Sequence, residues 1–170
     1  MLALALLAAR PLRAEEPARR PPQPVKAEFI TEHASIRPGG QTRVAIRFEL
    51  EPKWHIYAQD PGDAGLPTKI AWSGPDGTQF GPLIWPRPQT FTDPGDIKTN
   101  GYTGTLVLSS TLTLQPGRTW TGAVPLKANV SWLACKELCI PGSAMLKKTL
   151  LLSPEPPTPS ADAKFFKPAA

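Results

Sequence analysis

Residues 43–50 read Arg-Val-Ala-Ile-Arg-Phe-Glu-Leu, a stretch with a large apolar side chain at every second position. A β-strand turns successive side chains to opposite faces, so this alternation indicates a strand with one face on a core and the other in water. The same two-residue period returns in residues 106–114 and 124–132. Because no segment shows the 3.6-residue period of an amphipathic helix, we expect an all-β protein.

Weaker strands are expected around these three, separated by turns rich in Pro and Gly. The expected strands are residues 26–33, 53–58, 68–73, 78–85 and 144–152, and the turn signals are residues 38–40, 61–62, 74–77, 94–95 and 116–117. Seven to nine short strands in one stretch predict an immunoglobulin-like sandwich of two antiparallel sheets. We place this sandwich in residues 26–152.

The two ends of the chain differ from the middle in composition. Residues 1–9 are apolar and are followed by Arg-Pro, which predicts that residues 1–14 are a signal peptide lacking its basic start, and hence an exported protein. Residues 15–25 are predicted to be a Pro-rich disordered linker. Residues 153–170 repeat that composition and are predicted to be a Pro-rich disordered tail.

Charge and hydropathy exclude two broad classes of function. The formal net charge is +5, but the basic residues of the middle are scattered, with Lys147 and Lys148 as the one adjacent pair. No stripe of charge matches a phosphate backbone, so we expect no nucleic-acid partner. No run reaches the roughly 18 apolar residues of a transmembrane helix, so we expect no transmembrane helix. We expect one domain between the two ends of the chain, and we expect it to be monomeric.

The chain has two cysteines, Cys135 and Cys139, in the segment Trp-Leu-Ala-Cys-Lys-Glu-Leu-Cys-Ile-Pro-Gly of residues 132–142. Three intervening residues allow the two sulfurs to meet in a loop after the third strong strand. A structural staple is one interpretation, although closing so short a loop removes only roughly 2 kcal/mol from the unfolded state. A disulfide that exchanges with other thiols is the second interpretation.

A metal site is the third interpretation, because soft thiolates suit Cu(I). Candidate further ligands are His33, His55 and Met145. Both histidines are interpreted as ordinary surface residues, and the βαβ framework of thioredoxin-type copper carriers is not indicated. We therefore expect no metal.

Five segments occur in an order that is familiar as a set. They are Trp-His-Ile-Tyr at 54–57, Pro-Gly-Asp-Ala-Gly-Leu-Pro at 61–67, Trp-Pro-Arg-Pro at 85–88 followed by Phe91, Gly-Tyr-Thr-Gly at 101–104, and residues 132–141 around the cysteines. Together they resemble the N-terminal periplasmic domain of the thiol:disulfide interchange protein DsbD, over residues 26–152.

The resemblance implies a periplasmic sandwich whose cysteine pair relays electrons. The donor is a membrane thiol reductase, and the acceptors are thioredoxin-fold periplasmic proteins such as disulfide isomerases or cytochrome c maturation proteins. It implies that Cys139 forms mixed disulfides and that Cys135 resolves them. No cofactor is needed beyond the redox-active Cys135–Cys139 disulfide.

A cap loop with an aromatic residue shields the pair in this family. The segment ending at Tyr102 corresponds to that loop, Tyr57 and Trp132 match residues lining the site, and Phe91 is our candidate for the cap. This sequence departs from the family in having fewer residues between the cysteines and a longer segment at 86–104. It also lacks the family's membrane and thioredoxin-like parts, so the membrane reductase is expected to be a separate protein.

Two charged residues between the cysteines bear on thiol chemistry. Lys136 favours a neighbouring thiolate and Glu137 opposes it. Because the two effects roughly cancel, we predict an ordinary thiol pKa for this pair. A non-catalytic binding module with a structural disulfide remains the alternative from a different functional class.

Overall fold

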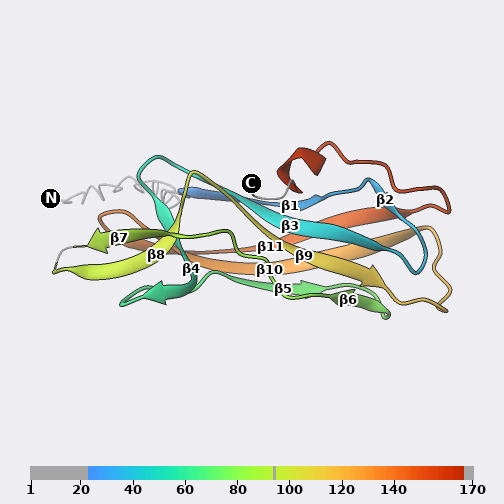
Figure 1. The fold of residues 1–170 in the computed structure, drawn as a ribbon, viewed down its shortest axis with the longest axis horizontal. Helices are drawn as coiled ribbons and strands as arrows, with labels where there is room; N and C mark the ends of the chain where they lie inside the picture. Colours follow the sequence, from blue (N-terminus) through green and yellow to red (C-terminus); the bar gives the residue numbers. More distant parts are fainter. Residues whose placement is uncertain (1–22, 94, 167–170) are drawn as a thin grey trace, which may run out of the picture.

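The computed structural model describes residues 23–93 and 95–166, which form two β-sheets packed face to face (Figure 1). The smaller sheet has four strands in the order β1-β3-β9-β6. Their bounds are Val25–Thr31 for β1, Gln41–Leu50 for β3, Thr105–Leu114 for β9 and Thr78–Phe80 for β6. All pairs within this sheet are antiparallel.

The larger sheet has the order β2-β11-β10-β4-β8-β7, and β5 also pairs with β10. The bounds are Ser35–Ile36 for β2, Cys139–Leu152 for β11, Ala123–Cys135 for β10, His55–Gly62 for β4, Ile97–Thr103 for β8, Gln89–Asp93 for β7 and Lys69–Ser73 for β5. Its pairs are antiparallel except for the short β2–β11 pair. The predicted all-β, immunoglobulin-like sandwich is confirmed.

The core lies between the sheets and is built from the alternating strands that the sequence indicates. Residues 124, 126, 128, 130 and 132 of β10 are all buried, and their neighbours at 125, 127, 129 and 131 are all exposed. Phe48 of β3 meets Trp132 of β10 edge to face, with ring centroids 5.7 Å apart. This contact joins the two layers through the strands with the clearest alternation.

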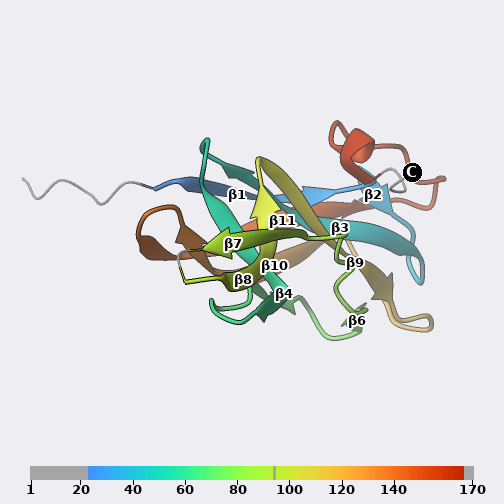
Figure 2. The same cartoon turned by 60° about the vertical axis from the view of Figure 1, so that its left-hand side comes forward.

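The hairpin formed by β7 and β8 lies within residues 86–104, which are expected from the sequence to form a loop. β8 pairs with β4, so this hairpin extends the larger sheet beyond β4 (Figure 2). Gly95 and Asp96 have φ of 88° and 60°, the left-handed conformations of a tight turn. The strands carry Thr, Gln, Asn and Lys, so neither shows the apolar alternation that would have predicted it. The predicted strand 78–85 is correspondingly shorter, because β6 ends at Phe80 before Pro82.

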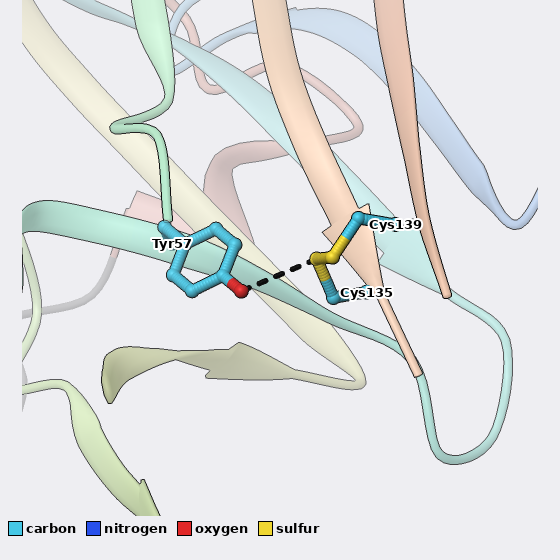
Figure 3. Close-up of a disulfide and its surroundings, with 3 residues drawn as sticks. All are labelled: Tyr57, Cys135 and Cys139. Carbon is cyan, nitrogen blue, oxygen red and sulfur yellow. Dashed lines mark hydrogen bonds between the residues drawn. A yellow bond between two sulfur atoms is a disulfide. The ribbon is translucent and has the colours of Figure 1, made fainter. Parts of the chain in front are cut away.

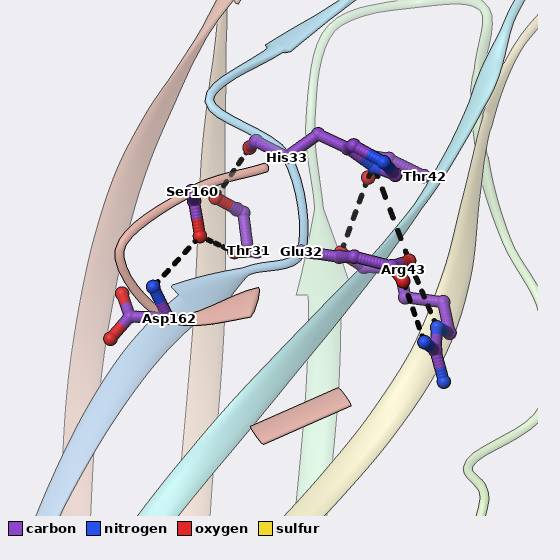
Figure 4. Close-up of polar contacts among 7 residues, drawn as sticks. All are labelled: Thr31, Glu32, His33, Thr42, Arg43, Ser160 and Asp162. Atoms are coloured by element: carbon purple, nitrogen blue, oxygen red, sulfur yellow. Dashed lines mark hydrogen bonds and ion pairs between the residues drawn. The ribbon is translucent and has the colours of Figure 1, made fainter. Parts of the chain in front are cut away.

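The prediction of a disordered tail after residue 152 is wrong for residues 153–166, which fold back onto the smaller sheet. The backbone N–H of Ala34 donates to Thr158 O at 2.9 Å, and that of Ser160 donates to Glu32 O at 2.9 Å. Figure 4 shows that the Ser160 hydroxyl also donates to the Thr31 carbonyl oxygen. The tail is therefore held by the backbone that links β1 to β2.

Aromatic packing supplies the rest of the tail's attachment. Phe166, in the short 3-10 helix Ala163–Phe166, is buried with Ile30 and Ala45 on the outer side of the smaller sheet. The Arg43 guanidinium lies 5.4 Å from the Phe166 ring centroid. These contacts bury apolar surface that residue composition alone does not reveal.

An ion pair strengthens the same region. The Arg43 guanidinium donates to both carboxylate oxygens of Glu32, at 2.9 and 2.6 Å (Figure 4). This bond lowers the pKa of Glu32 below its ordinary value and raises that of Arg43.

The N-terminal boundaries are also slightly different. β1 begins at Val25, and Pro24 is buried, so the predicted linker ends before residue 24. The predicted signal peptide and the linker up to residue 22 lie outside the described residues. In the described ranges, no helix is long and apolar enough to cross a membrane.

Candidate functional site

The two cysteines face each other across the hairpin that joins β10 to β11. Cys135 ends β10, Cys139 begins β11, and they are partners in the strand register with their Cα atoms 4.1 Å apart. Their sulfurs are joined in a disulfide (Figure 3). The backbone N–H of Lys136 donates to Leu138 O at 3.1 Å, which closes the turn between them.

The two halves of this disulfide differ in access. Cys135 is 4% exposed, whereas Cys139 is an exposed residue. The difference follows from the sheet order, because Cys135 is also paired with His55 of β4 on its other side. β11 meets β2 only at Leu151 and Leu152, far from Cys139. Cys139 is therefore accessible to a thiolate from solvent, whereas Cys135 is not.

Tyr57 of β4 makes a direct contact with the buried sulfur. Its hydroxyl donates to Cys135 Sγ at 3.2 Å, and the tyrosine is 4% exposed (Figure 3). Gly65 leaves room for the ring, since a Cβ at that position would lie within 2.6 Å of three ring carbons. Thr68 donates from its hydroxyl to Tyr57 O at 3.0 Å, which ties the strand to the segment that follows it.

His55 belongs to the same site, and its interpretation as a surface histidine is wrong. It is 7% exposed, its ring stacks on Phe91 at a centroid distance of 4.8 Å, and it meets Tyr57 edge to face at 5.3 Å. His55 is covered by Phe91 of the β7–β8 hairpin, and the sequence of β4 alone does not reveal this contact. His55 and Tyr57 lie two residues apart on one strand and therefore share a face. Since Tyr57 is expected to line the site, the same reasoning would place His55 there as well.

The structure places Phe91 beside the site through His55. It lies on β7, and its side chain is half-buried. Gly101 belongs to β8, the strand between β7 and β4, and it has no side chain to separate Phe91 from His55. A Cβ at Gly101 would lie 2.4 Å from Ile56 O. This arrangement suits a lid over His55, and the role of Phe91 as a cap stays a prediction.

Tyr102 and Trp132, by contrast, face the core and not the disulfide. Tyr102 is the register partner of Ile56, and its hydroxyl donates to Pro86 O at 2.8 Å. Burial raises the pKa of Tyr102. Trp132 lies three residues before Cys135 and so points to the opposite face of β10. The expectations that Tyr102 belongs to the cap and that Trp132 lines the site are therefore corrected.

Of the remaining candidate residues, two lie in the cysteine turn and the candidate copper ligands other than His55 lie elsewhere, whereas His55 is paired with Cys135. Lys136 and Glu137 are exposed in the turn itself. Met145 is six residues beyond Cys139 on β11, about 20 Å away along the strand. His33 lies between β1 and β2, where its Nδ1 contacts the Thr42 hydroxyl at 2.8 Å. Among the described residues, no group of three or more His, Cys, Asp or Glu side chains is arranged to hold a metal ion.

Comparison with known proteins points to thiol chemistry. Residues 21–151 match the family described as thiol:disulfide interchange protein DsbD, N-terminal. Among solved structures, the N-terminal periplasmic domain of ScsB from Proteus mirabilis superposes with a TM-score of 0.58 at 23% identity, covering 85% of this chain and 51% of that one. This chain thus spans about half the length of that structure.

A second solved structure, the reduced N-terminal domain of DsbD from Neisseria meningitidis, has a TM-score of 0.39 and 15% identity. The match covers 72% of this chain and 86% of that one. No curated protein matches this sequence.

Proposed function

This chain belongs to the family of N-terminal domains of the thiol:disulfide interchange protein DsbD, and we propose that it relays electrons through Cys135 and Cys139 in the periplasm. The donor in this proposal is a separate membrane thiol reductase. The acceptors are oxidised thioredoxin-fold proteins, of the disulfide isomerase or cytochrome c maturation type. The observation that supports it most is the unequal access of the two sulfurs, with Cys139 exposed and Cys135 covered.

Reduction of the disulfide begins at the exposed sulfur. A thiolate of the donor attacks Cys139 Sγ, the Cys135–Cys139 bond breaks, and Cys135 leaves as a thiolate. The donor's second thiolate then attacks the donor's own sulfur in the mixed disulfide and releases Cys139. Two electrons have moved to this chain, and the donor carries a new disulfide.

Delivery to the acceptor runs through the same two sulfurs. The Cys139 thiolate attacks the acceptor's disulfide and forms a mixed disulfide, and the expelled acceptor sulfur takes up a proton. Cys135 then attacks Cys139 Sγ, which restores the internal disulfide and frees the reduced acceptor. The 4.1 Å Cα separation keeps Cys135 close enough for this resolving step.

Tyr57 assists the reduction of the disulfide. Its hydroxyl donates to Cys135 Sγ from a buried position, where a hydrogen bond to a charged sulfur is stronger than in water. A neutral disulfide sulfur is a weak acceptor, so this bond strengthens as negative charge develops on Cys135. Tyr57 thereby stabilises the leaving group of the first step.

Single-cysteine variants test the proposal. The probe is a thioredoxin-fold protein whose nucleophilic cysteine carries an aryl thiol in a disulfide. Cys135→Ala should displace the aryl thiolate rapidly through Cys139 and hold a stable mixed disulfide. Cys139→Ala should react far more slowly, because its remaining thiol is covered. Equal rates, or no mixed disulfide with either variant, would contradict the relay.

A further inference from the structure

The disulfide lies on the outer face of the larger sheet, at one end of a continuous strip of side chains. Side chains two residues apart on a strand share a face, so Cys135 shares its face of β10 with residues 133, 131, 129 and 127. Their register partners on β11 are residues 141, 143, 145 and 147. β5 continues this face on the other side of β10, where Lys69 pairs with Ser131 and Ala71 with Asn129 (Figure 1).

Two adjoining hollows run along this strip. One has a volume of about 850 Å³ and is lined by β5, β10 and β11, with the exposed Met145 among its lining residues. The other, about 510 Å³, lies toward the cysteine hairpin and includes Leu66 and Pro141. Lys69, Ser131 and Ser143 line both hollows, so the two form one depression that leads toward Cys139.

Beyond the cysteine turn, which carries Lys136 and Glu137, the charged residues along the two hollows are basic. Lys69, Lys127 and Lys147 are exposed along this face, and no carboxylate is among the described residues that line either hollow. Lys127 and Lys147 are direct cross-strand partners, a placement of like charges that costs stability. None of the three takes part in an ion pair within residues 23–93 and 95–166. A partner with an acidic surface bound to this face would neutralise the repulsion between Lys127 and Lys147.

The dimensions match a folded domain. Eight residues separate the cysteine pair from Lys127 and Lys147 on their strands, about 26 Å at 3.3 Å per residue. A domain of about 100 residues has a radius of gyration near 13 Å, and is therefore about 33 Å across. Such a domain, with its cysteine at Cys139, extends over the depression as far as these lysines.

We propose that the outer face of β5, β10 and β11 is the docking surface for the exchange partner, a folded domain of thioredoxin size with carboxylates across the face that carries its reactive cysteine. This inference rests on the proposed function and adds the partner's charge and the face it occupies. The lysines steer the partner, and the apolar floor at Leu66 and Met145 receives an apolar side chain beside its cysteine.

The test compares a protein reductant with a small one. The protein probe is a reduced thioredoxin-fold domain with carboxylates across the face that carries its C-x-x-C motif, and the small probe is dithiothreitol. The face variant is Lys69→Glu, Lys127→Glu and Lys147→Glu combined. The matched control, Lys26→Glu, Arg37→Glu and Lys164→Glu, makes the same change in net charge on residues outside this face.

At low salt the face variant should be reduced by the protein probe at least about tenfold more slowly than the control, because steering changes association rates by roughly 10 to 1,000-fold. Reduction by dithiothreitol should stay within about twofold for both, which excludes a folding defect. Replacing the probe's carboxylates with Lys should restore the rate for the face variant.

A face variant as fast as the control, or equally slowed with dithiothreitol, would overturn the docking face while leaving the relay intact. If the wild-type disulfide does not react with the protein probe, the proposed function itself fails, and the docking surface with it.

Discussion

Removing the Tyr57 hydroxyl tests how the buried sulfur is made a good leaving group. In Tyr57→Phe the ring keeps its packing against Gly65 and His55, and the donor at 3.2 Å from Cys135 Sγ is lost. A hydrogen bond to a charged group contributes about 1.5–3 kcal/mol. If about half the thiolate charge has developed in the transition state, the barrier rises by about 0.75–1.5 kcal/mol, and exchange slows about 4- to 13-fold.

The assay is the rate at which dithiothreitol reduces the disulfide, followed by acid quenching and alkylation of free thiols. Tyr102→Phe is the matched control, since it removes a buried hydroxyl from the core side of the same sheet, where it bonds Pro86 O. Its rate should stay within about twofold of wild type, because that hydroxyl does not contact the sulfurs. A Tyr57→Phe rate equal to that of Tyr102→Phe would refute the reasoning.

Titration gives an independent readout of the same hydrogen bond. In Cys139→Ala, the thiolate absorbance of Cys135 is followed against pH with and without Tyr57→Phe. Loss of the donor should raise the pKa of the Cys135 thiol, because the hydrogen bond favours its charged form. An unchanged midpoint would show that the hydroxyl does not stabilise the thiolate.

Three further predictions concern the surroundings of the site. Gly65→Ala should lower the free energy of unfolding by about 1–3 kcal/mol in urea titrations, because φ is +104° and the new Cβ overlaps the Tyr57 ring; an unchanged midpoint would contradict this packing. Glu32→Gln should cost about 1 kcal/mol at neutral pH through loss of the bond to Arg43. Because that bond lowers the pKa of Glu32 below 4.5, the contribution of the bond to stability is complete above pH 4.5 and should vanish as the pH falls through the lowered pKa. A stability difference between Glu32→Gln and wild type that persists in acid would contradict this prediction. Phe166→Ala should cost about 3–5 kcal/mol and expose residues 153–166 to proteolysis, whereas an equally protected tail would show that the buried ring does not hold it.

The sandwich was predictable wherever burial is one-sided. In β3, β9 and β10, one face meets the core, so the two-residue period is visible in the sequence. The cysteine hairpin follows from the spacing of Cys135 and Cys139 after the last of these strands. Local pattern and tertiary structure agree at these positions.

Other features depend on contacts between segments distant in sequence. His55 is buried because Phe91 of the β7–β8 hairpin stacks on its ring, and the strands of that hairpin are mostly polar. Phe166 is buried because the tail returns to Ile30 and Ala45, more than 100 residues earlier. The access of the two sulfurs follows from the sheet order, which places β4 beside Cys135. None of these is encoded in a local period.

The reduction potential of the Cys135–Cys139 disulfide tests the central claim most directly. It is measured by equilibration with a glutathione redox buffer and alkylation of free thiols. An accessible disulfide that relays electrons should have a potential between about −300 and −180 mV, within the range of exchange proteins. A potential well below about −300 mV would place it among structural disulfides and contradict the account.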